Sequence, residues 1–416
     1  MKVSCLQENL ARGLNLVTRA VAPRSTLPVL GNVLVATESG RLRLSATNLE
    51  LGITCWIGAK IEDEGATTVP ARTFADLVSA LPNDRVDMEL TVRTQTLNVR
   101  CGQSNNDIKC IDAQEFPPLP PTDLESDLVL NVGDLREMIT QVVFAASSDD
   151  ARPVLTGVLL EINAGEMTLA SADGFRLSVR TAHLSTPAAG PIRAIVPARA
   201  LAELARVISD GEESVSMTLP PNRGQVIFRA KNVELVSQLI DGAFPDFQGI
   251  IPTSFATRSV LPTLAFLKAC KAADIFAREA AHSARLRITP RGELEPGTVE
   301  VSATAAETGS NETIVDATIE GNPIEIAFNV RYLLDVLGVI DTPNVALETT
   351  GSSSPGVIRP VGREDFPTSS CRCTWGASRV MKSPLPGEEN RSSQEPRLLH
   401  HAPRLTSASC GNAPNG

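Results

Sequence analysis

Residues that could carry out acid–base or nucleophilic chemistry are scarce in this sequence. Residues 1–365 contain two histidines, His183 and His282, and neither has a nucleophile motif nearby. The patterns GxxxxGK[ST], HExxH and GxSxG do not occur, and no GxGxxG follows an expected strand. Because a hydrolytic triad needs a histidine beside its nucleophile, we predict no catalytic residue.

Potential metal ligands are present but poorly spaced. The cysteines and histidines between Cys371 and Cys410 are spread over about forty residues, whereas zinc sites usually place two cysteines two to four residues apart. Asp149 and Asp150 are adjacent and lack a nucleotide-binding motif, which favours a solvated turn over a Mg²⁺ site. We therefore predict no metal and no cofactor.

The remaining chemistry is positive charge on helix faces. Leu10, Leu14 and Val17 follow the period of a helix with one buried face, and Arg12 and Arg19 lie on the opposite face. Similar segments occur at 72–81, 135–142, 199–208, 264–271 and 333–337. Any one polar face is equally consistent with an ordinary solvated helix. Six of them favour contact with a phosphate backbone, which needs charge but no base-specific donors.

The composition is that of an ordinary globular chain. It has 416 residues, of which 42% are hydrophobic and 21% charged, and no apolar run approaches the ~20 residues of a membrane span. The amino terminus has no apolar secretion signal, and the eight cysteines are too scattered for a disulfide framework. We expect a cytoplasmic protein of roughly three domains. Its net charge of −10 excludes a generally basic surface but allows a local basic lining.

An internal repeat supports three domains. The sequence VPAR opens helical segments at 69–72 and 196–199, and NVR opens a third at 329–331. Pro28-Val29-Leu30 recurs at 153–155, and Ala46-Thr47-Asn48 has its counterpart at 171–173, both shifted by 125 residues. Each copy alternates short strands with two amphipathic helices, which predicts an α+β fold. Phe-Pro pairs at 116–117 and 244–245 close the first two copies and give domains 1–122, 123–252 and 253–366, followed by a tail at 367–416.

Several segments together resemble the bacterial DNA polymerase III beta subunit family, the sliding clamps. The resemblance covers residues 1–366 and is carried by RSTLPVLGNVLV, SATNLELGI, ASADGFRLSV, LIDGAFPDF, IEIAFNVRYLLDVL and the two VPAR turns. It implies three repeated DNA-clamp domains in a head-to-tail dimeric ring, with helices inside and sheets outside. It also implies a non-catalytic processivity factor that encircles duplex DNA, is loaded by an ATP-driven clamp loader and tethers the polymerase through its α subunit.

The resemblance assigns roles to individual residues. By position it implies DNA contact by Arg24, Arg72, Arg199 and Arg206; the helix faces alone add Arg12, Arg19, Lys268, Lys271 and Arg278. Ile108, Ile275 and Phe276 are candidates for the dimer interface, with core packing as the alternative.

The family also has a pocket for short peptides of the polymerase, the loader and other proteins with a clamp-binding motif. Its matching positions are Leu155, Gly174, Arg176, Leu177, Pro245, Ile250, Asn329 and Tyr332. Ala172, Phe175 and Gly249 replace a threonine, a histidine and an arginine that are common in the family, which predicts a different peptide preference.

The resemblance ends abruptly at Phe366. The repeat predicts one more strand there, and the family closes with a short apolar strand, but this sequence continues as PTSSCRCTWG and runs about fifty residues further. We predict that the last strand is missing and that residues 367–416, rich in Ser, Pro, Arg and Gly, are disordered. We hypothesise out-of-frame translation from about Pro367. The alternative function is a clamp-derived interaction scaffold whose altered carboxyl terminus impairs client binding or ring formation.

Overall fold

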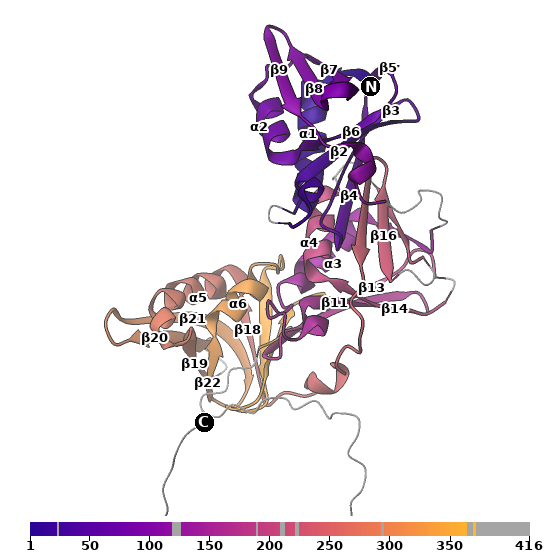
Figure 1. Ribbon diagram of the computed structural model, residues 1–416. Helices are drawn as coiled ribbons and strands as arrows, with labels where there is room; N and C mark the ends of the chain where they lie inside the picture. Colours follow the sequence, from indigo (N-terminus) through magenta and orange to yellow (C-terminus); the bar gives the residue numbers. More distant parts are fainter. Residues whose placement is uncertain are drawn as a thin grey trace, which may run out of the picture. The chain divides into compact units, whose positions relative to one another are not determined.

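The structure is a computed structural model that divides into two units, Met1–Ala377 and Ser378–Gly416. It describes residues 1–22, 25–118, 126–188, 190–208, 213–220, 224–292, 295–363 and, by backbone alone, 369–371. All of these lie in the first unit (Figure 1). Arg24 and the tail, apart from residues 369–371, lie outside the described residues.

The first domain contains two helices and nine strands among its described residues. In chain order they are β1 (Lys2–Leu6), α1 (Gln7–Val17), β2 (Asn32–Glu38), β3 (Arg41–Thr47), β4 (Leu51–Gly58), β5 (Lys60–Asp63), β6 (Ala66–Pro70), α2 (Ala71–Ala80), β7 (Arg85–Thr91), β8 (Thr96–Cys101) and β9 (Ser104–Lys109). Pro70 is the N-cap of α2. Because proline has no backbone N–H, it ends a strand ladder without preventing the helix that follows.

The second and third domains repeat this order. The second consists of β10 (Leu128–Asn131), α3 (Val132–Val143), β11 (Gly157–Asn163), β12 (Glu166–Ala172), β13 (Arg176–His183), β14 (Ile192–Pro197), α4 (Ala198–Val207), β15 (Ser214–Thr218), β16 (Gln225–Ala230) and β17 (Val233–Gln238). The third consists of β18 (Thr257–Pro262), α5 (Thr263–Ala277), β19 (Ser283–Thr289), β20 (Gly297–Ala305), β21 (Gly309–Gly321), β22 (Ile324–Asn329), α6 (Val330–Leu337), β23 (Asn344–Thr349), β24 (Gly356–Pro360) and β25 (Ser369–Cys371). The predicted α+β class is confirmed.

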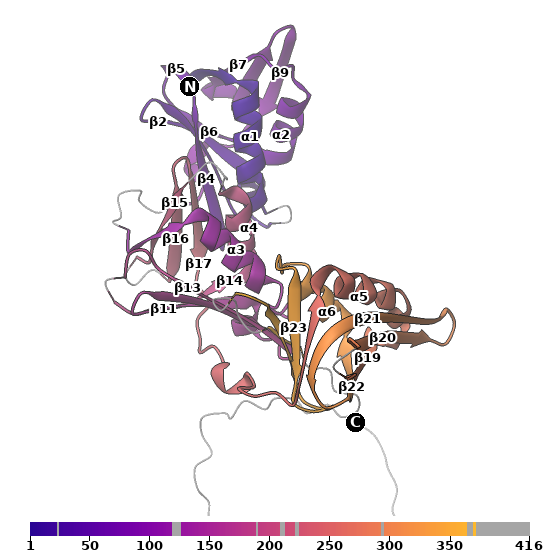
Figure 2. The same ribbon diagram turned by 180° about the vertical axis from the view of Figure 1, so that it is seen from behind.

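Neighbouring domains share antiparallel sheets. The strand orders are β5-β1-β7-β8-β9, then β10-β15-β16-β17-β4-β3-β2-β6, then β14-β11-β12-β13-β25-β24-β23-β18-β21-β20-β19-β22. The last strand of the second domain, β17, therefore pairs with β4 of the first, from Val233↔Cys55 to Ser237↔Leu51. In each domain two helices pack against each other and against the strands (Figures 1 and 2).

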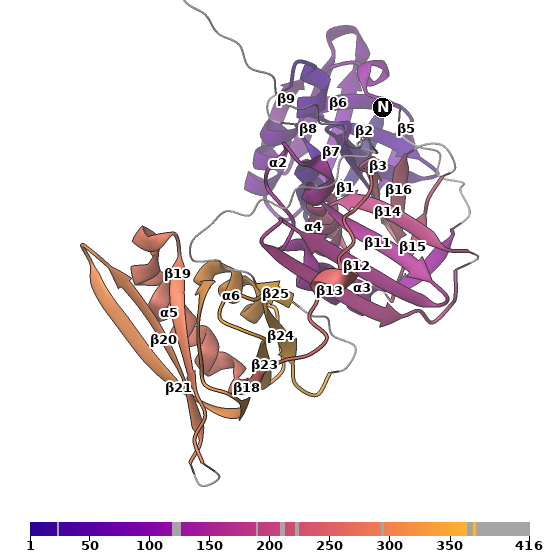
Figure 3. The ribbon, with the colours of Figure 1, turned by 90° about the horizontal axis from the view of Figure 1, so that it is seen from below.

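The prediction that the last strand is missing was wrong. Residues 369–371 form β25, which pairs with Arg176–Ser178 of β13 on one side and Gly356–Ile358 of β24 on the other. Figure 3 labels β25 beside β24. Strand pairing uses backbone donors and acceptors, so a Ser-Ser-Cys segment takes the place expected for an apolar strand.

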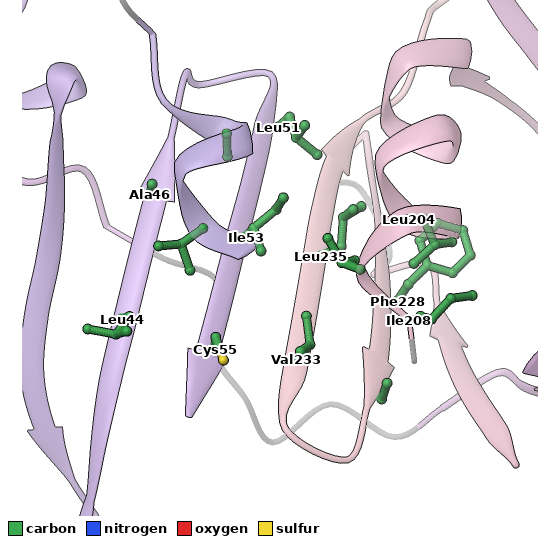
Figure 4. Packing of buried hydrophobic residues seen from close by; sticks show 14 of the residues in the cluster. Leu44, Ala46, Leu51, Ile53, Cys55, Leu204, Ile208, Phe228, Val233 and Leu235 are labelled. Atoms are coloured by element: carbon green, nitrogen blue, oxygen red, sulfur yellow. The ribbon is translucent and has the colours of Figure 1, made fainter. Parts of the chain in front are cut away.

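The hydrophobic core is continuous across the first two domains, and the third has a core of its own. Figure 4 shows Leu51 and Ile53 of β4 beside Leu235 of β17, where the two domains join. The predicted apolar faces of α1, α3 and α4 are confirmed, since Leu10, Leu14 and their counterparts there are buried. On α5 the prediction was wrong for Leu264, which is 71% exposed, because the buried face of that helix is formed by Phe266, Ala269, Cys270 and Ala273. The first helix, α1, ends at Val17, and Thr18–Ala20 continues it as a 3-10 turn.

Candidate DNA-facing and client-binding surfaces

Most of the predicted DNA-contacting residues lie on exposed helix faces. Arg12 is on α1, Arg72 on α2, and Arg199 and Arg206 are on α4; all four are exposed. Lys268 and Lys271 are exposed on α5, and Arg278 follows its last turn. Each helix pair thus presents cations on the face opposite its core residues. We call this set, without Arg19, the cationic helix face.

Several of these arginines pair with a carboxylate on their own helix. Arg12 lies 2.7 Å from Glu8, and Arg206 lies 2.7 Å from Glu203. Arg72 approaches Asp76 at 3.8 Å. The pairs of Arg12 and Arg72 are exposed on both sides and contribute about 0–1 kcal/mol, so a phosphate can replace their carboxylates at little cost. Glu203 is only 13% exposed.

Arg19 has a different position from the one its helix period suggested. It lies in the 3-10 turn after α1 and is half-buried, and its Nη1 is 3.2 Å from Glu203 of α4. This pair joins the first domain to the second. The structure therefore favours a bracing role for Arg19 at the domain junction.

The predicted client-binding residues separate into two groups. The first lies around an apolar cluster on the second domain that includes Leu177, Val179, Phe244 and Phe247. Leu155 is buried in a 3-10 turn at Pro153–Thr156, while Pro245 is exposed and Ile250 half-exposed beside the cluster's two phenylalanines. We call this cluster with its rim the client surface; its rim includes Leu155, Gly174, Phe175, Pro245 and Ile250.

A tight turn positions the rim of the client surface. The Asp173 Oδ1 accepts hydrogen bonds from the backbone N–H groups of Phe175 at 2.8 Å and Arg176 at 2.9 Å. Gly174 adopts φ +93°, and a Cβ there would lie 3.0 Å from Nη1 of Arg152. Glycine suits this position because it adopts positive φ without strain. The turn holds the Phe175 side chain 61% exposed.

Arg176, Tyr332 and Asn329 form the second group, at the junction with the third domain. Arg176 donates from Nε to Asp173 at 3.0 Å and from Nη1 to Asp335 of α6 at 2.5 Å. Its guanidinium lies 4.5 Å from the ring centroid of Tyr332. Asn329 is the N-cap of α6, and its side chain accepts a hydrogen bond from the N–H of Arg331 at 3.0 Å. Arg176 therefore joins the two domains.

The three dimer-interface candidates differ in exposure. Ile108 of β9 is buried against the first domain's own core, which was the alternative for this position. Ile275 of α5 is 58% exposed, and Phe276 is partly buried against the third domain's core. Of the three, Ile275 is best placed to contact another molecule.

Sequence reasoning missed one cation beside these surfaces. Arg136 of α3 is half-buried and donates to the carbonyls of Ala205 at 3.1 Å and Ile208 at 2.6 Å, at the end of α4. Its only signal in the sequence is a basic residue next to the apolar stripe of α3. A packed partner helix is needed to give it a role.

The described residues show no arrangement typical of metal-dependent chemistry. No group of three or more His, Cys, Asp or Glu side chains in this part of the chain could hold a metal ion. His282 lies 3.2 Å from Asp274 without a nucleophile motif, and His183 pairs with Glu166 on the surface. No helix among the described residues is long and apolar enough to span a membrane.

This architecture, with three α+β domains that share sheets, is the three-domain sliding clamp fold. Sequence profiles of the DNA polymerase III beta subunit match the chain with their N-terminal domain at residues 1–120, their central domain at 129–246 and their C-terminal domain at 248–370. The chain belongs to the DNA polymerase III beta subunit family.

Relatives and solved structures agree with this assignment. The beta sliding clamp of Synechococcus elongatus is 35% identical over 366 residues, covering 87% of this chain and 96% of the relative, and that of Bacillus subtilis is 30% identical over 368 residues, covering 86% and 96%. The crystal structure of the DNA polymerase sliding clamp from Bacillus subtilis matches with a TM-score of 0.84 at 27% identity over 90% of this chain and 100% of that one. The sliding clamp from Pseudomonas aeruginosa matches with a TM-score of 0.80 at 29% identity over 89% and 99%.

Proposed function

We propose that this chain is a DNA sliding clamp, a non-catalytic ring that encircles duplex DNA and tethers the replicative polymerase during synthesis. The observation that carries the proposal is the match over 87% of the chain to a protein named beta sliding clamp. A sliding clamp needs a closed ring, a cationic lining that ignores base sequence, and a surface that binds client proteins. The described residues support each of these requirements.

The pairing of strands between domains supports a head-to-tail ring. The last strand of the second domain, β17, pairs with β4 of the first, and the last strand of the third, β25, pairs with β13 of the second. The strand β21 holds the same place in the third domain as β4 in the first and β13 in the second. The repeat therefore pairs the last strand of the first domain, β9, with β21 of a third domain. Among the described strands β9 has only β8 as a neighbour, and residues 309–313 of β21 pair only with β20. A second copy of the chain offers the missing partner to both edges.

Side chains near these edges suit such an interface. Ile314 on β21 is 60% exposed, and Ile275 is exposed on α5 of the same domain. Arg100 and Lys109 are exposed on β8 and β9, and Glu312 is exposed on β21. Exposed apolar residues with opposite charges on the two edges favour specific association over aggregation.

The cationic helix face supports contact with duplex DNA. Its arginines and lysines are exposed, and the ion pairs of Arg12 and Arg72 are weak, so these side chains can follow the phosphate backbone from one register to the next. Such contacts are independent of base sequence and weaken with salt. A closed ring needs no stronger contact, because its topology prevents escape.

The client surface supports the binding of short peptides from partner proteins. It combines an apolar cluster with a polar rim, as peptide-binding sites do. We propose that its clients include the α subunit of DNA polymerase III, the clamp loader and other proteins with a clamp-binding motif. We also propose a cytoplasmic location, and domain boundaries near residues 122 and 252.

A loading assay tests the proposed function. The native mass of the full chain is measured, and the chain is incubated with a cognate clamp loader, ATP and nicked circular DNA. We expect a dimer that stays on circles and is lost when they are linearised. A monomer that never loads, or retention that survives linearisation, would contradict the proposal.

A pair of variants tests the DNA-facing surface. The double substitution Arg72→Glu with Arg199→Glu should shorten retention on circles at least severalfold, because it reverses two charges of the lining. Arg193→Glu is the control, since Arg193 is exposed on β14 and paired with Glu161, away from the helices. Equal retention of all three proteins would remove Arg72 and Arg199 from the surface.

A further inference from the structure

A cavity of about 460 Å³ lies between the first and second domains. Its walls come from α1, the end of β4, α3, the end of α4 and the first residue of β17 with the turn before it. This volume falls within the ~300–1,000 Å³ typical of small-molecule sites. The client surface and the predicted dimer interface do not include these walls, but Arg12 and Arg206 of the cationic helix face do line the cavity.

The cavity combines a cationic rim with an apolar lining. Arg12, Arg136 and Arg206 are its charged residues, and none of the described residues that line it is acidic. Leu16, Ile57 and other aliphatic side chains provide the lining. In a chain of net charge −10, three arginines around one cavity without a lining carboxylate form a local site for an anion.

The three arginines differ in how firmly they are held. Arg136 is fixed by its hydrogen bonds to the carbonyls of Ala205 and Ile208 at the end of α4. Arg12 and Arg206 are 67% and 58% exposed, and each pairs with a glutamate on its own helix. Because the exposed pair of Arg12 is weak, Arg12 can turn towards a ligand, while Arg136 supplies a fixed charge. Arg206 is held by Glu203, which is 13% exposed and also pairs with Arg19, so its charge stays at the rim.

We propose that this cavity binds a single small organic anion that has an apolar aromatic body. The arginines would hold the anionic group by charge-assisted hydrogen bonds, and the aliphatic lining would cover the body. A bare phosphodiester would leave the apolar lining uncovered, so the cavity suits an amphipathic ligand better than a DNA backbone. A bound ligand would contact α1 and α4 together and so would brace the junction that β4 and β17 form.

Titration of the full chain with anilinonaphthalene sulfonate, an aromatic anion that fluoresces when shielded from water, tests the proposal. We expect one site per chain. Asn9 lines the cavity on α1, whereas Asn15 is exposed on the same helix and does not line it. Asn9→Phe should weaken binding at least tenfold by filling the cavity, and the matched control Asn15→Phe should not.

A second pair of variants, each with one arginine replaced, keeps the test valid if Asn9→Phe fails to fold. Arg206→Gln should weaken binding about tenfold, the equivalent of one lost charge-assisted hydrogen bond. Arg199→Gln, on the same helix but outside the cavity, should leave binding unchanged. Equal weakening of binding by the two arginine variants, or several equivalent sites per chain, would overturn the proposal. This titration needs neither a loader nor a client, so its failure is separate from failure of the proposed function.

Discussion

Glu234 is a buried charge beside the junction of the first two domains, and removing its partner tests how that junction is stabilised. Its side chain is 4% exposed on β17, and Arg229 of β16 donates to its Oε2 from Nε at 2.9 Å and from Nη2 at 2.6 Å. Burial raises the pKa of Glu234 above its ordinary value, although Arg229 acts in the opposite direction. Glu38 raises this pKa further and Arg43 lowers it.

Arg229→Met should leave Glu234 buried without its hydrogen-bonded countercharge. Breaking a buried pair costs about 3–5 kcal/mol, and because Arg229 is partly exposed we expect the low end, about 3 kcal/mol near neutral pH. The pKa of Glu234 is higher in the folded chain than in the unfolded chain, so protonation favours the folded state. The destabilisation is therefore present above the folded pKa and decreases as the pH falls through it. The difference in the free energy of unfolding between the variant and the parent should narrow as the pH falls from neutral through the folded-state pKa of Glu234.

Hydrogen exchange of the amides in β16 and β17, with thermal unfolding of the full chain, measures this effect. The double variant Arg229→Met with Glu234→Gln should recover most of the lost stability, because a neutral amide needs no countercharge. Arg258→Met is a matched control: Glu348 would keep Arg359 at 3.0 Å, so the cost should be smaller. If the stability lost by Arg229→Met is independent of pH, or is equal to the stability lost by Arg258→Met, the reasoning is refuted.

Three further predictions concern the second junction, the client surface and the buried thiols. Arg176→Met should destabilise the contact between the second and third domains by about 2 kcal/mol, measured as faster amide hydrogen exchange in α6 and β24. Asp335→Asn should have a smaller effect, because Asp335 is half-exposed. Unchanged exchange in the Arg176→Met variant would contradict this prediction. Gly174→Ala should cost about 1 kcal/mol by forcing a side chain into positive φ and should weaken binding of a client peptide in a calorimetric titration. Burial raises the pKa of the Cys5 thiol to about 12 and also raises the pKa of the Cys270 thiol. Both thiols should therefore resist alkylation near pH 8 until the chain unfolds. Rapid labelling of either cysteine in the folded chain would refute this prediction.

The sequence predicted the parts of the fold that depend on local pattern. The apolar period gave α1, α3 and α4 the correct buried face, because a helix with one core side requires that spacing. It failed on α5, where small residues and Phe266 face the core and Leu264 is 71% exposed. The VPAR turns marked where α2 and α4 begin, since Pro70 and Pro197 end a strand ladder and precede a helix. These signals are repeated along the chain, which made the three copies recognisable.

Strand β25 shows where this reasoning fails. An apolar strand was expected after β24, so a Ser-Ser-Cys segment gave no signal. The segment pairs because β13 and β24 leave two open backbone edges, which a strand of almost any composition can satisfy. The sequence pattern of one segment does not show which unpaired strand edges distant segments will form.

The predicted sites were limited in the same way. Leu177, assigned to the client surface by position, lies in its apolar cluster, and Leu155 follows Val154, which packs against that cluster. The contacts of Arg19 and Arg136 depend on α4, a helix far from them in the sequence, so spacing alone indicated neither the ion pair of Arg19 with Glu203 nor the hydrogen bonds of Arg136. Long side chains are hard to place from sequence because several partners lie within their reach.

Equivalent positions in the repeat have taken different roles at the two junctions. Asn48 accepts hydrogen bonds from the N–H groups of Glu50 and Leu51, as Asp173 does from Phe175 and Arg176, so Leu51 and Arg176 occupy the same place in their copies. Leu51 is buried in the core that the first two domains share. Arg176 instead joins the second domain to α6 through an ion pair and a tyrosine face. The first two domains therefore share one apolar core, whereas the third has a core of its own and is joined to the second through a directional ion pair as well as strand pairing.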